Sequence, residues 1–257
     1  MYIKEVGIMD LPKTKYPSLL GDVWGTRTAD NRKNKMGSEG LSVILGVEGN
    51  NVVKMSFNGV VGVYGAVDRS AVVVSALVQL GMGYSADEAV FSIYSNTDGY
   101  LALKHLPNTV DYGRIGSFSF NELYDEYRSR RDILRSSGLS YEEYLKLHSE
   151  VVMPFHVVVI DGVEDFKNNF GNSMNLLDFL LEGWYYGYSV VLVGDAPIPL
   201  HHSVVVSRGT DDGADEVSLL SDGVHYQRVR FLPIDTDMER TVRSVYRLFC
   251  KAESCIW

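Results

Sequence analysis

Four short runs of almost uninterrupted apolar residues dominate the chain, and amphipathic stretches separate them. An apolar run of this length, bounded by Gly, Asp or Asn, is typical of a strand that helices cover on both faces. Strands that alternate with helices predict an α/β fold with a mostly parallel central sheet flanked by helices. The predicted core strands are residues 60–64, 89–94, 155–160 and 189–193.

A β-hairpin is predicted before the first core strand, and two further strands are predicted late in the chain. Residues 41–47 and 52–57 favour strands and flank a turn at 48–51 that contains Gly and Asn. Residues 203–207 and 226–231 also have the composition of strands. The hairpin is therefore expected as an N-terminal addition to the parallel sheet.

Helices are predicted where apolar residues recur every three or four positions. Ser119 with Glu122, and Ser140 with Glu143, have the spacing of a capping box, which satisfies backbone N–H groups at a helix start. Gly138 suits the left-handed position that follows a helix. The predicted helices follow Gly65 and then cover residues 101–106, 120–137, 140–147, 172–186 and 237–251.

The first 40 residues have weak hydrophobic periodicity and differ from the rest of the chain. We expect residues 1–40 to form a lead-in segment and an exposed loop, and residues 41–257 to form a single domain. The exposed loop carries a basic cluster, which we interpret as a solvated surface in preference to a contact for an acidic partner. The cluster consists of Arg27, Arg32, Lys33 and Lys35.

The composition is that of a globular protein. Of the 257 residues, 46% are hydrophobic and 22% are charged, and the formal net charge is −9. An acidic balance argues against a general nucleic-acid-binding protein, which normally presents a basic face. Neither a signal peptide nor an apolar run long enough to span a bilayer is recognisable. The only cysteines, Cys250 and Cys255, fit a reducing compartment better than a disulfide or a metal site.

The turn after the first core strand has the position of a phosphate-binding P-loop but lacks its chemistry. An intact P-loop, G-x-x-x-x-G-K-[ST], supplies backbone N–H groups, a Lys for the phosphates and a hydroxyl for Mg²⁺. In an ungapped alignment, Ser70, Ala71 and Val72 replace the second Gly, the Lys and the hydroxyl residue. A gapped alignment puts Arg69 and Ser70 on the Lys-Ser pair but leaves a loop too short to wrap a phosphate. The degenerate loop is Gly65-Ala66-Val67-Asp68-Arg69-Ser70-Ala71-Val72.

The strand at 155–160 ends in Asp161, which is the pattern of a Walker B strand. In that motif the Asp holds Mg²⁺ through water, and a following acid activates the attacking water. Here Gly162 follows, so the second carboxylate is missing. Glu164 and Asp165 are close enough to replace it, but we favour their placement in the first turn of the next helix, where acids are stabilising. We therefore assign no catalytic residue and no metal ligand.

Two other groups of residues have both a structural and a functional interpretation. His156 lies inside a core strand and is expected to be a hydrogen-bonded structural histidine. The adjacent pair at 201–202 is a poor metal site, because neighbouring side chains in an extended chain point in opposite directions. An aromatic cluster is expected to pack in the core, and the alternative is a surface groove for an apolar peptide or helix. The cluster consists of Trp184, Tyr185, Tyr186 and Tyr188.

An ordered set of short motifs resembles a known family, although no single motif is specific. The set resembles the FtsK/SpoIIIE-type ATPase modules of the type VII (ESX) secretion motors EssC and EccC, over roughly residues 41–235. The Asp-Gly pair at 161–162 is similar to the sequence at this position in the downstream modules. The free-looking end at 256–257 is similar to that of the last module of a Firmicutes EssC. The motifs are the hairpin, Val63-Tyr64-Gly65-Ala66, Leu106-Pro107-Asn108, Arg130-Arg131, Gly138-Leu139-Ser140-Tyr141-Glu142-Glu143-Tyr144, Val158-Val159-Ile160-Asp161-Gly162 and Gly187-Tyr188-Ser189-Val190-Val191-Leu192.

The resemblance implies a RecA-like P-loop NTPase fold with a degenerate nucleotide site. The parent of such a module is a membrane-anchored hexameric ATPase that carries several modules in tandem, while an isolated module can be a monomer. Downstream modules bind ATP weakly or not at all, so no cofactor is expected beyond weakly bound ATP and Mg²⁺. The implied partners are neighbouring ATPase modules and small helical-hairpin substrates, at the cytoplasmic face of the bacterial cell membrane.

Three functions are compatible with these observations. The first is an inactive module that recognises secretion substrates or regulates its neighbours. The second is a weak ATPase that uses Arg69 and Asp161, completed by an arginine from an adjacent subunit. The third is a DNA-translocating module, which the acidic balance and the missing Lys disfavour. We favour the first, because an Ala and a Val supply neither a charge for phosphate nor a ligand for Mg²⁺.

Overall fold

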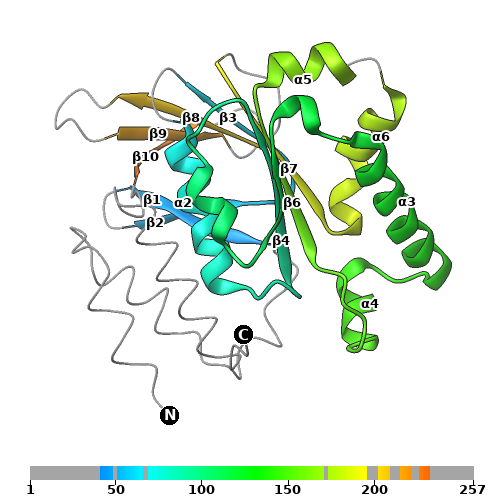
Figure 1. The fold of residues 1–257 in the computed structure, drawn as a ribbon. Helices are drawn as coiled ribbons and strands as arrows, with labels where there is room; N and C mark the ends of the chain where they lie inside the picture. Colours follow the sequence, from blue (N-terminus) through cyan, green and yellow to red (C-terminus); the bar gives the residue numbers. More distant parts are fainter. Residues whose placement is uncertain are drawn as a thin grey trace, which may run out of the picture.

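A ten-stranded sheet organises the chain (Figure 1). The computed structural model describes residues 41–48, 51–65, 69–170, 173–195, 202–208, 215–220 and 226–231. The order of strands across the sheet is β2-β1-β10-β9-β8-β3-β7-β6-β4-β5. Their bounds are β1 Ser42–Glu48, β2 Asn51–Ser56, β3 Gly59–Gly65, β4 Ala89–Ser95, β5 Thr109–Gly113, β6 Phe155–Asp161, β7 Tyr188–Gly194, β8 His202–Arg208, β9 Asp215–Leu220 and β10 Tyr226–Phe231.

One half of the sheet is parallel and confirms the predicted α/β fold. Every neighbouring pair from β8 through β3, β7, β6 and β4 to β5 is parallel. The four predicted core strands are β3, β4, β6 and β7. The edge strand β5 was not predicted, because its sequence is polar and its residues are half-buried or exposed.

The other half of the sheet is antiparallel, and here the expected alternation of strands and helices is wrong. The hairpin of β1 and β2 is confirmed, but β8, β9 and β10 follow one another and pair antiparallel. The connections between them are too short for parallel crossovers, which need a dozen or more residues. Strand β10 pairs with β1, so the hairpin joins the same sheet as the parallel strands.

Two hydrophobic cores lie on the two faces of the parallel strands. Side chains alternate between the faces along each strand, and in β6, for example, Val157 and Val159 belong to one core while Val158 and Ile160 belong to the other. Helix α2 (Arg69–Gly83) packs on the first face. Helices α3 (Phe120–Ser137), α5 (Val163–Phe170) and α6 (Met174–Glu182) cover the second face (Figure 1). Burial on both faces explains why these strands are continuous apolar runs.

Shorter helices connect the main elements. They are the 3₁₀ helices η2 (Leu101–His105), η3 (Ile115–Ser117) and η4 (Gly183–Tyr186), and the helix α4 (Tyr141–Leu147). The helix predicted at 172–186 is therefore α6 followed by η4. No helix within the described residues is long and apolar enough to cross a membrane. The segment 1–40, the helix predicted at 237–251, both cysteines and residue 201 lie outside the described residues.

The two predicted capping boxes have different outcomes. At α4, Glu143 N–H donates to Ser140 Oγ at 3.3 Å and Ser140 N–H donates to Glu143 Oε2 at 3.0 Å, which confirms the capping box. The Ser140 hydroxyl and N–H lower the pKa of the Glu143 carboxyl below its usual range. At α3, the Ser119 side chain makes no capping hydrogen bond, so that prediction is wrong. The buried rings of Phe118 and Phe120 hold that helix start instead.

Replacing the Ser140 hydroxyl tests the contribution of the cap. Ser140→Ala removes the acceptor of a helix N–H, so we expect a loss of about 1 kcal/mol in the free energy of unfolding. Ser119→Ala is the matched control and should change it by no more than a few tenths of a kcal/mol. Urea titration of the three proteins measures both values, and equal losses for the two variants would contradict the structure.

Candidate functional site

The predicted site residues lie at the carboxyl edge of the parallel strands. Strand β3 ends at Gly65, β6 ends at Asp161, and β7 lies between the two strands. Ser95, at the end of β4, is paired in register with Asp161. In open parallel sheets the crevice outside these strand ends is where ligands bind. The structure therefore places Gly65 and Asp161 at the same edge of the sheet.

The structure describes only some of the residues that are predicted to form the degenerate P-loop. Ala66, Val67 and Asp68 lie outside the described residues. Residues 69–72 form the first turn of α2. Val72 is 1% exposed and packs in the first hydrophobic core, and Ala71 packs against that core. Neither side chain carries a group that binds phosphate or Mg²⁺, and Val72 points away from the carboxyl edge into the core.

Arg69 lies at the start of α2, and its guanidinium already has partners within the chain. Its Nη1 donates a hydrogen bond to the carbonyl oxygen of Gly65 at 2.9 Å and forms an ion pair with Asp195. A cation is unfavourable at the N-terminus of a helix because the helix dipole is positive there. The Asp195 carboxylate offsets this cost and ties the start of α2 to the end of β7. An incoming phosphate would compete with Asp195 for the same guanidinium.

Asp161 is held by hydroxyl groups of the neighbouring strand end. Ser95 Oγ and Thr97 Oγ1 both donate to its Oδ2, at 3.1 and 3.3 Å. Thr97 is fixed in turn, because its backbone N–H donates to Ser95 Oγ at 3.0 Å. Hydrogen bonds to a carboxylate are stronger than those between neutral groups. A hydrated Mg²⁺ would have to displace these donors to use the same oxygen.

Gly162 occupies the position where a Walker B motif has its second acid. Its φ angle is +127°, in a region that glycine adopts readily and other residues do not. A Cβ atom built on Gly162 would overlap Cδ1 of Ile115, which is buried. Backbone conformation and packing together therefore exclude a carboxylate side chain at this position in the observed structure.

The two acids nearest to Gly162 belong to the helix that follows it. Glu164 and Asp165 lie in the first turn of α5, as the sequence predicts, and both are exposed. Asp165 accepts a hydrogen bond from Asn96 Nδ2 at 2.9 Å, so it holds the turn after β4 in place.

The turn between β4 and η2 fills the space beside the start of α2. A Cβ atom at Gly99 would lie 2.8 Å from Ser70 Oγ, so the turn approaches α2 at a point where only glycine fits. Arg114 donates to the carbonyl oxygen of Asn96 and lies 3.8 Å from Asp98. The polar groups at this edge are therefore bound mainly to one another. No group of three or more His, Cys, Asp or Glu side chains in the described part of the chain is arranged to hold a metal ion.

The aromatic cluster divides between core and surface. Tyr188 is 1% exposed and packs in the second core, and Tyr186 packs against it. Trp184 and Tyr185 are 42% and 55% exposed, and their ring centroids are 3.8 Å apart. The packing interpretation is thus correct for two members, while the other two lie on the surface. His202 lies in β8.

The fold is similar to that of secretion-motor and conjugation ATPases. EssC from Geobacillus thermodenitrificans (ATPases 2 and 3) matches with a TM-score of 0.68 and 15% identity over 85% of this chain and 50% of that chain. EccC from Thermomonospora curvata (ATPases 2 and 3), in complex with a signal sequence peptide, matches with a TM-score of 0.66 and 15% identity over 80% of this chain and 47% of that chain. The chain has the fold of these ATPase domains. It spans about half the length of these two structures.

A third similar structure is the pCW3 conjugation coupling protein TcpA with ATPγS, with a TM-score of 0.60 and 15% identity over 86% of this chain and 73% of that chain. No protein-family model matches the sequence, and no curated protein matches it significantly. The structural matches alone establish the RecA-like P-loop ATPase fold. The sequence identities are too low to extend the likeness to function.

Sequence reasoning missed the partners that occupy the site. Asp195 follows β7, while Ser95 and Thr97 end β4 and begin its turn. Each follows an apolar strand in the sequence, as Asp161 does. Because the carboxyl ends of parallel strands meet at one edge, this shared position is a signal that could have identified them.

A substitution at Gly162 tests whether its backbone and packing exclude a side chain. Gly162→Ala places a Cβ atom at a positive φ and against Ile115, so we expect a loss of about 1–3 kcal/mol in the free energy of unfolding. Gly116→Ala is the control, because a Cβ atom there meets nothing within 4 Å. Chemical denaturation measures both. A Gly162→Ala protein as stable as the Gly116→Ala protein would contradict this account.

Proposed function

We propose that this chain is a module of a type VII secretion motor that does not hydrolyse ATP and that takes part in recognising secretion substrates or regulating secretion. The observation that carries the proposal is that the two charged groups at the carboxyl edge, Arg69 and Asp161, are already bound to other side chains of this chain. Arg69 is paired with Asp195, and Asp161 accepts hydrogen bonds from Ser95 and Thr97.

Several requirements of ATP hydrolysis are unmet at this edge. A P-loop ATPase needs a cation for the phosphates, a hydroxyl ligand for Mg²⁺ and a carboxylate that positions the attacking water. Arg69 would have to leave Asp195, Val72 offers no ligand, and Gly162 carries no carboxylate. Four acids near the edge would repel a triphosphate further: Asp161, Glu164, Asp165 and Asp195. We therefore propose that ATP and Mg²⁺ bind weakly or not at all, and we assign no catalytic residue.

The structural neighbours support a place in a motor with several modules. The EssC and EccC structures each contain ATPases 2 and 3, and the EccC structure is a complex with a signal sequence peptide. By analogy, this module has neighbouring ATPase modules and small helical-hairpin substrates as partners. We further propose a hexameric parent protein at the cytoplasmic face of the bacterial cell membrane, with no nucleic acid bound.

An exposed apolar stripe on α6 and η4 is the surface best suited to a helical partner. The stripe consists of side chains at helical spacing that are 42–77% exposed: Met174, Leu177, Leu181, Trp184 and Tyr185. Contiguous exposed apolar side chains mark interaction sites, and Trp and Tyr are enriched in the centres of interfaces. The stripe therefore provides a contact surface for an amphipathic helix of a secretion substrate.

Binding of a substrate to the full chain tests this function. The probe is the C-terminal peptide of a type VII substrate from the same organism, and the measurement is its dissociation constant by calorimetry. Leu181→Ser should weaken binding about tenfold, because it removes an apolar contact from the centre of the stripe. Leu101→Ser is the control, since Leu101 is 55% exposed but lies on η2.

Two results would count against recognition of substrates by this surface. If the wild-type chain binds neither the peptide nor an intact substrate pair, the recognition function is wrong. If both variants bind as tightly as the wild-type chain, substrates bind this module at a different surface.

A further inference from the structure

Among the described helices, those on the second face of the sheet stop short of its parallel end. Helix α6 contacts β3, and α3 packs beside α6 against β7 and β6, where the rings of Tyr127 and Tyr188 meet and Glu126 Oε2 lies 3.8 Å from His156 Nδ1. Strands β4 and β5 are the last two strands beyond β6. Neighbouring strands lie about 4.8 Å apart and a helix is about 10 Å wide, so one helix covers about two strands. The helical layer therefore has space for one more helix beside α3.

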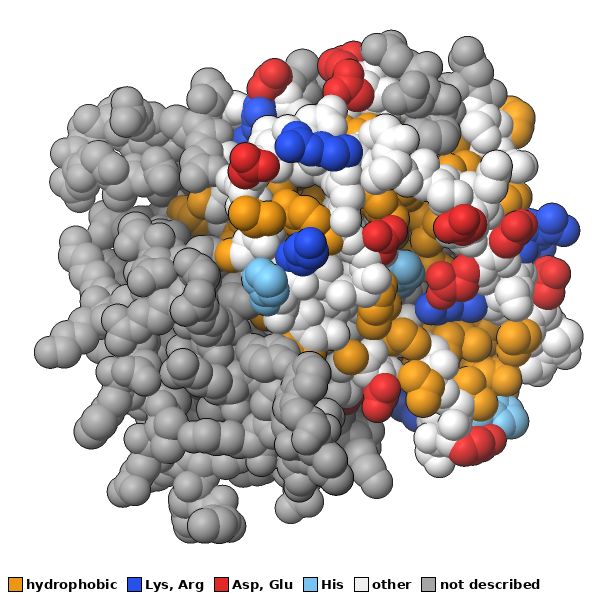
Figure 2. All heavy atoms as spheres, in the orientation of Figure 1, with side chains coloured by type: hydrophobic (Ala, Val, Ile, Leu, Met, Phe, Trp, Pro, Cys, Tyr) orange, Lys and Arg blue, Asp and Glu red, His pale blue; other side chains and the backbone are white. Residues whose placement is uncertain are grey.

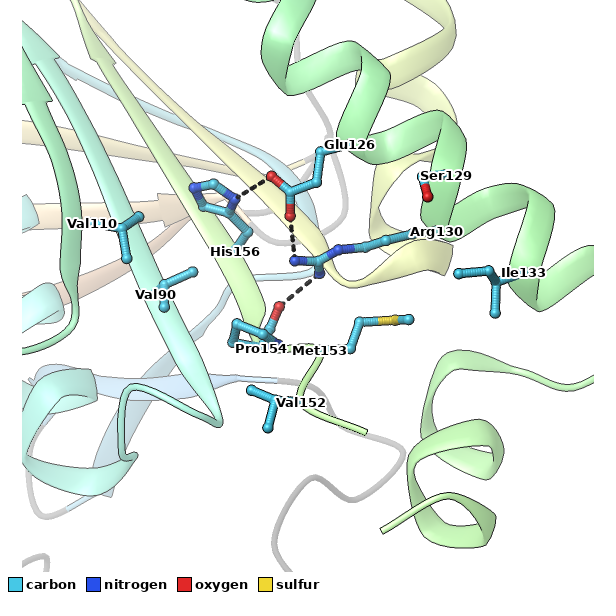
Figure 3. Close-up of a pocket in the computed structure, with 10 residues that line it drawn as sticks. All are labelled: Val90, Val110, Glu126, Ser129, Arg130, Ile133, Val152, Met153, Pro154 and His156. Carbon is cyan, nitrogen blue, oxygen red and sulfur yellow. Dashed lines mark hydrogen bonds and ion pairs between the residues drawn. The ribbon is translucent and has the colours of Figure 1, made fainter. Parts of the chain in front are cut away.

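A cavity with a mainly apolar lining lies in this space. It has a volume of about 440 Å³ and lies between α3 and the amino ends of β4 and β6 (Figure 3). Val110 on β5 is 58% exposed, Ile133 on α3 is 38% exposed and Val152 is 65% exposed. Exposed apolar side chains around a cavity mark an interaction site. The apolar residues of the lining are Val90, Val110, Ile133, Val152, Met153 and Pro154.

The polar side chains in the cavity wall are bound to one another or neutral. Arg130 donates from Nη2 to Glu126 Oε1 at 2.6 Å and from Nη1 to the carbonyl oxygen of Pro154 at 2.7 Å. His156 Nε2 and Ser92 Oγ share a hydrogen bond of 2.8 Å, and burial lowers the pKa of His156 to about 4, so its ring is neutral. Its buried Nδ1 has no hydrogen-bond partner in the described part of the chain, so the expectation of a structural histidine is met at one nitrogen only. The cavity therefore suits an apolar side chain.

Three arginines of α3 lie on the side of the helix away from β5. Arg131 Nη1 pairs with Asp178 of α6 at 3.1 Å, and Arg135 Nη2 pairs with Glu182 of α6 at 2.9 Å. Arg128 precedes Arg135 by seven residues, or about two turns, so it lies on the same side. Apart from the buried Arg130, the side of α3 that faces β5 therefore carries no arginine.

Acidic side chains occupy the side of α3 that faces β5. Glu122 and Glu126 are one turn apart and both exposed, and Glu126 lines the cavity. Asp111 of β5 accepts a hydrogen bond from the Tyr94 hydroxyl, and burial, Asp111 and Glu122 together raise the pKa of that hydroxyl, so both carboxylates lie near it. Within the described residues, neither Asp111 nor Glu122 forms an ion pair. Figure 2 shows acidic side chains gathered on the right of the view, above a group of hydrophobic side chains.

We propose that a basic amphipathic helix of a partner protein docks beside α3, over β4 and β5, and extends the helical layer. Its apolar face lies on Val110 and Ile133 and places one aliphatic side chain in the cavity. Its lysine or arginine side chains pair with Glu122 and Asp111. Glu122 precedes Ile133 by eleven residues, about 16 Å or three turns along α3, so the basic residues lie about three turns from the aliphatic anchor. This inference does not depend on the proposed function, because it uses neither the carboxyl edge nor the α6 stripe.

A titration of the full chain with a model helix tests the site. The probe is a labelled 14-residue peptide with two copies of Leu-Lys-Lys-Leu-Leu-Lys-Leu, and fluorescence anisotropy measures its dissociation constant. Ile133→Ser should weaken binding about tenfold, because it removes an apolar contact beside the cavity. Leu181→Ser alters the α6 stripe and should leave binding of this peptide unchanged.

A second pair of variants tests the charge complementarity. Glu122→Gln should weaken binding about threefold, as expected for the loss of one exposed ion pair. Glu164→Gln is the matched control, since it removes the same charge from an exposed position on α5 and should change nothing. The same peptide with glutamate in place of lysine should bind at least about tenfold more weakly, because several attractive contacts become repulsive.

Four results would overturn the proposal. In the first, Ile133→Ser binds as tightly as Leu181→Ser. In the second, Glu122→Gln binds as tightly as Glu164→Gln. In the third, the bound peptide gains no helix by circular dichroism, which would make the partner an extended segment. In the fourth, the chain alone forms a dimer that Ile133→Ser disrupts, which would make the partner a second copy. If Ile133→Ser fails to fold, the comparison of Glu122→Gln with Glu164→Gln decides the outcome.

Discussion

The hydrogen bonds from Ser95 and Thr97 to Asp161 are the interaction on which the functional account depends. They arise because β4 and β6 are parallel neighbours whose carboxyl ends meet at one edge of the sheet. The same geometry brings Arg69 at the start of α2 to Asp195 at the end of β7. In an active ATPase, groups at these positions bind Mg²⁺ and phosphate. Here they contact one another, and these contacts join α2 to β7 and β4 to β6.

Gly162 makes it difficult to add a second carboxylate at this edge. Its positive φ and the contact with Ile115 mean that a second acid cannot be added without moving the backbone or the buried side chain. Packing as well as residue identity therefore keeps a second carboxylate from position 162. The exposed apolar side chains of α6 and η4, which the proposed function assigns to a partner, lie elsewhere on the molecule.

The sequence was sufficient to predict the parallel core, because burial on both faces demands continuous apolar strands. It did not predict β5, whose residues Thr109 and Asp111 are polar, or the antiparallel pairing of β8, β9 and β10. It also did not predict the pairing of β1 with β10, which joins segments far apart in sequence. It did not predict that Ser119 leaves its helix uncapped, since the rings beside it decide that start.

The pairing of side chains was the feature that the sequence predicted least well. Arg130 is buried against Tyr188 and paired with Glu126. Such a pair depends on which face of α3 meets the sheet. The four-residue spacing of Glu126 and Arg130 is a local signal for the ion pair, although it gives no indication of burial.

The melting temperature of the full chain with ATP and Mg²⁺ tests the central claim most directly. A ligand present at a hundred times its dissociation constant stabilises the native state by about 2.7 kcal/mol, which raises the melting temperature by several degrees. If ATP bound with a dissociation constant of 0.1 mM, 5 mM ATP with Mg²⁺ would be roughly fifty times that constant and would raise the melting temperature by several degrees. The account predicts that 5 mM ATP with Mg²⁺ changes the melting temperature by less than about 1 °C. A magnesium-dependent rise of several degrees would contradict the account, because the groups at the carboxyl edge would then have to release their present partners and bind nucleotide.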